Sequence, residues 1–127
     1  MYTNEQEVER TAVAWIELHQ VPENSPEWEE LFWAFERVSA LVQDDPETAW
    51  RIIEVIRQKD GGDLVLSNLA AGPLEDLLVA HGEEFIVRIE AAAENDQQLR
   101  RILGATWQNE MSEELWARIQ AASSSSW

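Results

Sequence analysis

Apolar residues recur every three or four positions along nearly the whole chain, and this spacing predicts helices rather than strands. The first stripe holds Val8, Ala12, Trp15 and Ile16, which share one face of a helix. The alternation of apolar and polar residues that is typical of strands is nearly absent. The segments with helical spacing are 4–19, 26–42, 46–60, 63–69, 73–81, 83–93, 95–103 and the segment from 112 onward.

Two of these helices carry the same start signal. Ser25 precedes Pro26 and Asp45 precedes Pro46, so each proline takes the first helical position behind a good N-cap residue. The helix that begins at Pro26 is predicted to continue to position 42 and to bury one stripe, while Trp33 lies off that stripe. The stripe consists of Trp28, Leu31, Phe32, Phe35, Val38 and Val42.

Glycine and proline indicate where helices end. The pair Gly61 and Gly62 is expected to end the helix from Pro46, because glycine tolerates the left-handed conformation of a helix terminus. The pair at 72–73 is expected to break the chain, and Gly82 is expected to end the helix that follows. His81 then lies in the last helical turn, where the helix dipole favours a cation.

These signals predict an all-α fold: a single compact domain of seven or eight short helices packed as antiparallel hairpins. A HEAT-like repeat is an alternative, supported only by the two similar helix starts. The predicted domain spans 1–122, and the serine-rich segment 123–127 is predicted to be a mobile tail.

The chain has 25 Asp and Glu against 9 Lys and Arg, a formal net charge of −16. The acid is spread over both halves, with 14 acidic and 5 basic residues in 1–60 and 11 and 4 in 61–127. Direct nucleic-acid binding is not expected, because phosphate contacts need a basic surface. The charge has two interpretations: simple solubility, or a negative face that docks on a basic partner.

Other functions are disfavoured by what the sequence lacks. Without cysteine there is no disulfide, thiolate chemistry or cysteine-based metal site. The polar, acidic start does not resemble a signal peptide, and no apolar run approaches a membrane span, so we expect a cytoplasmic protein without membrane contact.

The residues also give no catalytic motif. Upstream positions one helical turn from His19 and His81 carry apolar residues, so neither histidine has a local metal-ligand partner. The nucleophile elbow and the glycine-rich phosphate loops are absent. We therefore expect no enzyme activity, no metal and no cofactor.

Tryptophan is unusually frequent, with seven in the chain. Trp15 and Trp28 lie on predicted stripes and are assigned to the core. The others within the helical region are predicted at the edge or off the stripes, where they belong either to a wide buried face or to an interface. These residues are Trp33, Trp50, Trp107 and Trp116.

Residues 71–78 read A-G-P-L-E-D-L-L and are followed by His81 and Gly82. This string resembles the core of a family of small, uncharacterised bacterial helical domains. Ile86, Ile89 and Trp107 stand where that family has an Ile-x-x-Ile helix and a tryptophan, so the resemblance covers about 45–107. It implies a soluble helical domain of bacterial origin and carries over no catalytic residue. Glu75, Asp76 and His81 could serve either structure or binding.

The leading functional hypothesis is a non-enzymatic, acidic immunity-type or inhibitor protein that neutralises a basic protein partner. A toxin or a nucleic-acid-handling enzyme has a basic cleft, which an acidic protein can occupy as a phosphate mimic. The alternative is a helical adaptor that binds a protein or peptide through an apolar groove of Trp and Leu. The sequence leaves the oligomeric state open. The predicted partner-binding residues are Glu23, Glu27, Glu30, Trp33, Asp44, Asp45 and Glu47.

Overall fold

The helix starts at Ser25 and Asp45 form as the sequence predicts. Ser25 Oγ accepts a hydrogen bond from the backbone N–H of Trp28 at 3.2 Å. The Asp45 carboxylate accepts from the backbone N–H of Thr48 at 3.3 Å and from its hydroxyl at 2.7 Å. Each side chain thereby satisfies one of the N–H groups that a helix N-terminus leaves without an internal acceptor.

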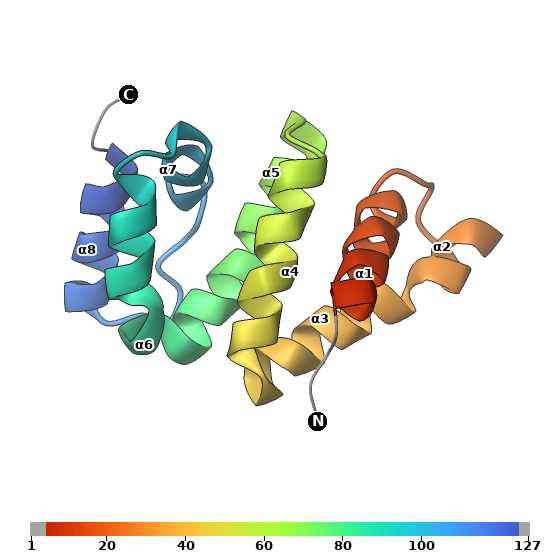
Figure 1. The fold of residues 1–127 in the computed structure, drawn as a ribbon, viewed down its shortest axis with the longest axis horizontal. Coiled ribbons are helices and arrows are strands. Elements are labelled where there is room, and N and C mark those ends of the chain that lie inside the picture. Colours follow the sequence, from red (N-terminus) through yellow and green to blue (C-terminus); the bar gives the residue numbers. More distant parts are fainter. Residues whose placement is uncertain (1–4, 125–127) are drawn as a thin grey trace.

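The computed structural model describes residues 5–124, and within them the regular structure is all helical, as predicted (Figure 1). The elements are α1 (Glu5–Leu18), α2 (Pro26–Leu31), α3 (Trp33–Asp44), α4 (Pro46–Lys59), α5 (Asp63–Leu69), the π-helical turn η1 (Ala70–Leu74), α6 (Glu75–Ala93), α7 (Gln97–Leu103) and α8 (Glu113–Ser124).

The helices form a single domain in two parts that share one core. α1, α3 and α4 pack on one another, and the second half of α6 packs with α7 and α8 at the other end (Figure 1). The run from α5 through η1 into α6 lies between them and contacts α4. Most predicted stripe residues are buried, including Trp15, Ile53 and Leu78.

A buried arginine ties α4 to the start of α7. The Arg57 guanidinium donates to the Glu54 carboxylate at 2.8 and 2.9 Å and forms an ion pair with Asp96 at 2.8 Å. Burial opposes the charge of Arg57, but these hydrogen bonds outweigh it and raise the pKa of Arg57. Asp96 also caps α7 by accepting from the N–H of Leu99, so one carboxylate serves two elements.

The predicted helix 26–42 is wrong in one respect, because it breaks at Phe32 into α2 and α3. α3 turns Ala34, Val38 and Val42 toward the core, four residues apart. Ala34 is fully buried in the core cluster, where little room is left for a larger side chain. Phe35 therefore lies on the outer side and is 46% exposed.

The expected breaks at 72–73 and at Gly82 are also corrected. The chain stays helical through Pro73 because η1 is a π turn, whose wider spacing accommodates the ring that an α-helix would exclude. At His81 the backbone leaves helical values (φ −138°, ψ 21°), which produces a kink, and α6 then continues to Ala93. The expected end at Gly82 is thus a change of direction within α6.

The C-terminal boundary differs as well. α8 continues to Ser124, whereas the sequence predicted a tail from Ser123. Ser123 is buried. The rest of the predicted tail, 125–127, lies outside the described residues.

A close contact between Gly82 and α8 lies beside the kink. A Cβ placed on Gly82 would overlap Cδ2 of Leu115 in α8, and Leu115 is itself buried. We expect Gly82→Ala to lower the free energy of unfolding by about 1–3 kcal/mol through overpacking, although alanine is the better helix former. Urea unfolding measures the change.

Gly72→Ala is the matched control, because a Cβ at Gly72 meets nothing within 4 Å. This variant should be neutral or more stable by up to about 1 kcal/mol, since alanine reduces the entropy of the unfolded chain. Equal destabilisation by both variants would contradict a specific role for the contact between Gly82 and α8.

Candidate partner-binding surface

Three aromatic rings form a stack on the outer side of α2 and the start of α3. The ring centroids of Trp28 and Phe32 are 4.7 Å apart, and those of Phe32 and Phe35 are 5.2 Å apart. Trp28 and Phe32 are only half-buried, and within residues 5–124 none of the three belongs to the core cluster. We call Trp28, Phe32 and Phe35 the aromatic face; its assignment to the core from the sequence is wrong.

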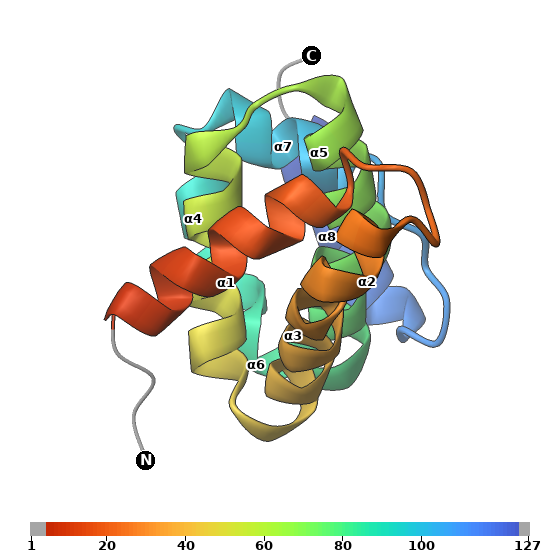
Figure 2. The same cartoon turned by 90° about the vertical axis from the view of Figure 1, so that its right-hand side faces the viewer.

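The aromatic face lies at one end of the molecule. α2 is the outermost helix at the right of Figure 1, and Figure 2 looks onto this end, where α1, α2 and α3 face the viewer. α2 contacts α1 and α3 and has no buried residue. A short helix with no fully buried side chain leaves part of its apolar surface available for a partner.

Acidic side chains accompany the aromatic face. Glu23, Glu27, Glu29 and Glu30 are all exposed, and the segment 20–36 contains no Lys or Arg. Within the described part of the chain, none of these four carboxylates has an ion-pair partner. The structure thus brings together three of the predicted binding residues, Glu23, Glu27 and Glu30.

Trp33, the predicted anchor, is not part of the aromatic face and packs against two arginines. The guanidinium of Arg10 lies 4.4 Å from its ring centroid and that of Arg37 lies 5.7 Å away. Both arginines also form ion pairs with Glu7, at 3.3 and 3.2 Å. Trp33 is half-buried against the core, so its ring already serves the contact between α1 and α3.

The remaining predicted binding residues, Asp44, Asp45 and Glu47, lie at the other end of α3, about 17 Å away along the helix. Asp44 is exposed and Asp45 is the cap of α4. Glu47 accepts two hydrogen bonds from Arg88 at 2.9 Å, and these lower the pKa of Glu47. The two predicted acidic clusters are therefore separate, and the second is largely engaged within the fold.

Nearly all of the basic side chains are paired with carboxylates of the same chain. Within residues 5–124, all of the nine Lys and Arg side chains except Arg100 form an ion pair with a carboxylate. Arg100 donates to the carbonyls of Ala93 and Glu94 at the end of α6. The ion pairs are Arg10–Glu7, Arg37–Glu7, Arg51–Glu5, Arg57–Glu54, Arg57–Asp96, Lys59–Glu9, Arg88–Glu47, Arg101–Asp63 and Arg118–Glu90.

The residues of the A-G-P-L-E-D-L-L string have mainly structural contacts. Glu75 is buried, and its carboxylate accepts from the backbone N–H of Trp107 at 2.8 Å and from Asn109 Nδ2 at 3.4 Å. These bonds fasten the loop between α7 and α8 to the start of α6. Trp107 itself is 75% exposed, and His81 lies at the kink with Nδ1 3.4 Å from Glu84.

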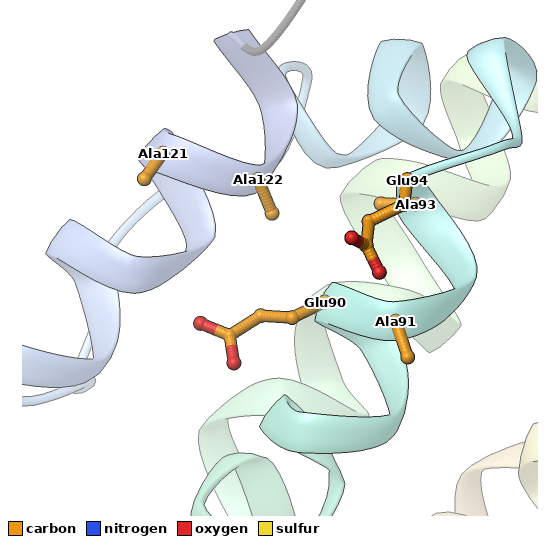
Figure 3. Close-up of a pocket in the computed structure, with 6 residues that line it drawn as sticks. All are labelled: Glu90, Ala91, Ala93, Glu94, Ala121 and Ala122. Atoms are coloured by element: carbon orange, nitrogen blue, oxygen red, sulfur yellow. The ribbon is translucent and has the colours of Figure 1, made fainter.

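The surface grooves are open, and the one shown in Figure 3 is lined by few reactive side chains. One of about 400 Å³ lies between α6 and α8 and is lined by alanines and two glutamates (Figure 3). Glu90 reaches into it and is paired with Arg118. Within residues 5–124, no group of three or more His, Asp or Glu side chains could hold a metal ion.

No helix of the described region is long and apolar enough to cross a membrane.

The fold and surface define an all-α domain with an acidic surface and a solvent-exposed aromatic face. A family model matches residues 21–127, and the chain belongs to this family, DUF6869, a family of unknown function. The match extends beyond 45–107 and leaves out α1. Comparison with curated proteins and with solved structures finds no match.

The stripe analysis missed the aromatic face. Phe32 and Trp33 are adjacent, but adjacency alone does not predict a break, because Ile52 and Ile53 are adjacent and both buried in α4. In this structure the helix breaks at Phe32, which lies outside the core cluster.

The contacts of Glu75 give a test of its structural role. Glu75→Ala leaves the N–H of Trp107 without its acceptor, so we expect the free energy of unfolding to fall by about 1–3 kcal/mol. Glu75→Gln should cost less, because the amide oxygen can accept the same bond. Chemical denaturation measures both, and Glu84→Ala, at an exposed position, should be neutral.

The contribution of Asp76 to the free energy of unfolding should depend on pH with a sign opposite to that of most carboxylates. Loss of hydration at its carboxylate, helped by the neighbouring Glu75 charge, raises the pKa of Asp76 above its ordinary value. The folded state therefore binds this proton more tightly than the unfolded state, which favours folding below the ordinary pKa and is lost as pH rises through the folded value. Asp76→Asn should thus be more stable than the natural chain at about pH 7, with the difference vanishing near pH 3. A difference independent of pH would contradict this.

Proposed function

We propose that this protein is an acidic, non-enzymatic binding protein that engages a basic protein partner through the end formed by α2 and the start of α3 and thereby neutralises it. A toxin or a nucleic-acid-handling enzyme is the kind of partner that fits. Its basic cleft would receive carboxylates in place of phosphates, as an immunity-type inhibitor requires.

The distribution of charge carries this proposal. The basic side chains are paired within the fold, whereas the carboxylates around α2 have no counter-charge in residues 5–124. A surface with one sign of charge attracts an opposite partner and accelerates its association. A purely solubilising charge does not require an adjoining aromatic face.

The docking region in this proposal is narrower than the one predicted from the sequence. Glu23, Glu27 and Glu30 remain, and Glu29 joins them. Asp45 and Glu47 have structural partners, and Asp44 lies at the far end of α3. Trp33 lies beneath two arginines, so the proposed aromatic anchor is the exposed Phe35 in its place.

The alternative function is a helical adaptor that binds an apolar or amphipathic peptide. The aromatic face favours it, because Trp28, Phe32 and Phe35 can provide hydrophobic contact without charge. The two functions differ in salt dependence. Ion pairing weakens as salt screens the charges, whereas apolar contact does not.

We also infer that the string at 71–78 is the defining core of the family. Pro73 requires the π turn, Glu75 fastens the loop after α7, and Leu77 and Leu78 are fully buried. Every one of these contacts stabilises the centre of the fold, which is consistent with a structural core and with binding residues elsewhere.

The test begins with the protein that co-purifies with a tagged copy in the native host. The purified pair is then titrated by calorimetry at about 50 mM and about 500 mM salt. We expect the affinity to fall at least tenfold between these conditions, because exposed ion pairs are screened. Unchanged affinity would overturn the electrostatic proposal and favour the adaptor.

Charge reversal locates the site. The triple variant Glu23→Lys, Glu27→Lys, Glu30→Lys should weaken binding at low salt by at least tenfold and remain folded. Its control is Glu110→Lys, Glu113→Lys, Glu114→Lys, which makes the same charge change at exposed positions before and within the first turn of α8. Equal loss in both variants would show that net charge alone matters, and no loss in the first would exclude the α2 end.

A further inference from the structure

Within residues 5–124, three arginines lie between an aromatic ring and a carboxylate. Arg10 lies 4.4 Å from the Trp33 ring and 3.3 Å from Glu7, and Arg37 lies 5.7 Å from the same ring and 3.2 Å from the same carboxylate. Arg88 lies 4.7 Å from the Phe85 ring and 2.9 Å from Glu47. In each, the guanidinium lies over the ring and pairs with a carboxylate oxygen.

The aromatic face has exposed ring surface and belongs to a segment with exposed glutamates and no arginine. Its three rings follow one another, with Trp28 tilted against Phe32 and Phe32 stacked on Phe35, and Phe35 is 46% exposed. Exposed carboxylates neighbour the rings in the sequence, with Glu27 and Glu29 beside Trp28 and Glu36 beside Phe35. Within residues 5–124 every arginine already has a partner elsewhere, so none remains to complete this surface.

We propose that the aromatic face and its flanking glutamates bind an arginine-bearing segment of the partner, one guanidinium stacking on Phe35 and further guanidinium groups pairing with the glutamates. This inference rests on the proposed function and specifies its partner, since an acidic surface alone would accept lysine and arginine equally. Stacking distinguishes the two cations, because a guanidinium is planar and weakly hydrated and an ammonium is neither.

The experiment uses the full chain and two short peptides of equal length and charge. One alternates arginine with serine, and the other has lysine in place of every arginine. Calorimetry at low salt gives both dissociation constants. We expect the arginine peptide to bind about two- to fivefold more tightly, the order of one cation–π contact at an exposed site.

Phe35→Leu removes the ring and keeps an apolar side chain at a position outside the core. This variant should bind both peptides with the affinity that the natural chain has for the lysine peptide. Phe35→Trp should retain or increase the preference for arginine, because tryptophan is the stronger cation–π acceptor. Trp107→Leu removes an aromatic ring elsewhere that is more exposed than Phe35, and it should leave the preference intact.

The outcomes separate this inference from the function on which it rests. Equal, salt-sensitive binding of both peptides, or an arginine preference that survives in Phe35→Leu, overturns the arginine-binding role and leaves the acidic binding protein standing. If neither peptide binds at low salt, both proposals fail. Loss of the preference in Trp107→Leu also overturns the role, because it would place the stacking contact on the other side of the molecule.

Discussion

α8 packs closely on Gly82, beside the kink at which α6 changes direction between the two parts of the molecule. Because position 82 has no side chain, Leu115 can fill the space beside the kink at His81. The second half of α6 then turns away from the first and packs with α7 and α8, while the first half remains against α4. The buried Arg57, with Glu54 and Asp96, also connects the two parts of the molecule, because it joins α4 to the start of α7.

The electrostatics of the fold follow from a shortage of positive charge. With 9 basic residues against 25 acidic ones, the arginines are used where helices meet: Arg37 with Glu7 joins α3 to α1, Arg88 with Glu47 joins α6 to α4, and Arg118 with Glu90 joins α8 to α6. Exposed pairs of this kind each contribute little to stability, about 0–1 kcal/mol. Their more important effect is on where charge remains unpaired. Because the basic residues are engaged at these contacts, the negative charge at the α2 end is not compensated, and the proposed function is based on this charge.

Local sequence signals predicted the positions of the helices well, but they predicted less well which helix faces are exposed. The caps at Ser25 and Asp45, the buried stripes and the all-α class follow from side-chain spacing and from hydrogen bonds within a few residues. Spacing did not predict the break at Phe32, nor that the helix continues through Pro73 and past the kink at His81. The π turn around Pro73 and the packing of α8 on Gly82 belong to the folded structure and leave no periodic pattern in the sequence. The candidate surface was found in part. Glu23, Glu27 and Glu30 were predicted, whereas Phe35 was assigned to the core.

The sequence by itself determined that this chain is a helical domain with excess acid, because helical periodicity, caps and charge are properties of neighbouring residues. Only the tertiary structure decided which carboxylates are neutralised and which aromatic rings are covered. Those outcomes depend on contacts between helices far apart in the sequence, such as Glu47 with Arg88 and Trp33 with Arg10. The same contacts leave Trp28, Phe32 and Phe35 outside the core, because α3 can present only one of its sides to α1 and α4.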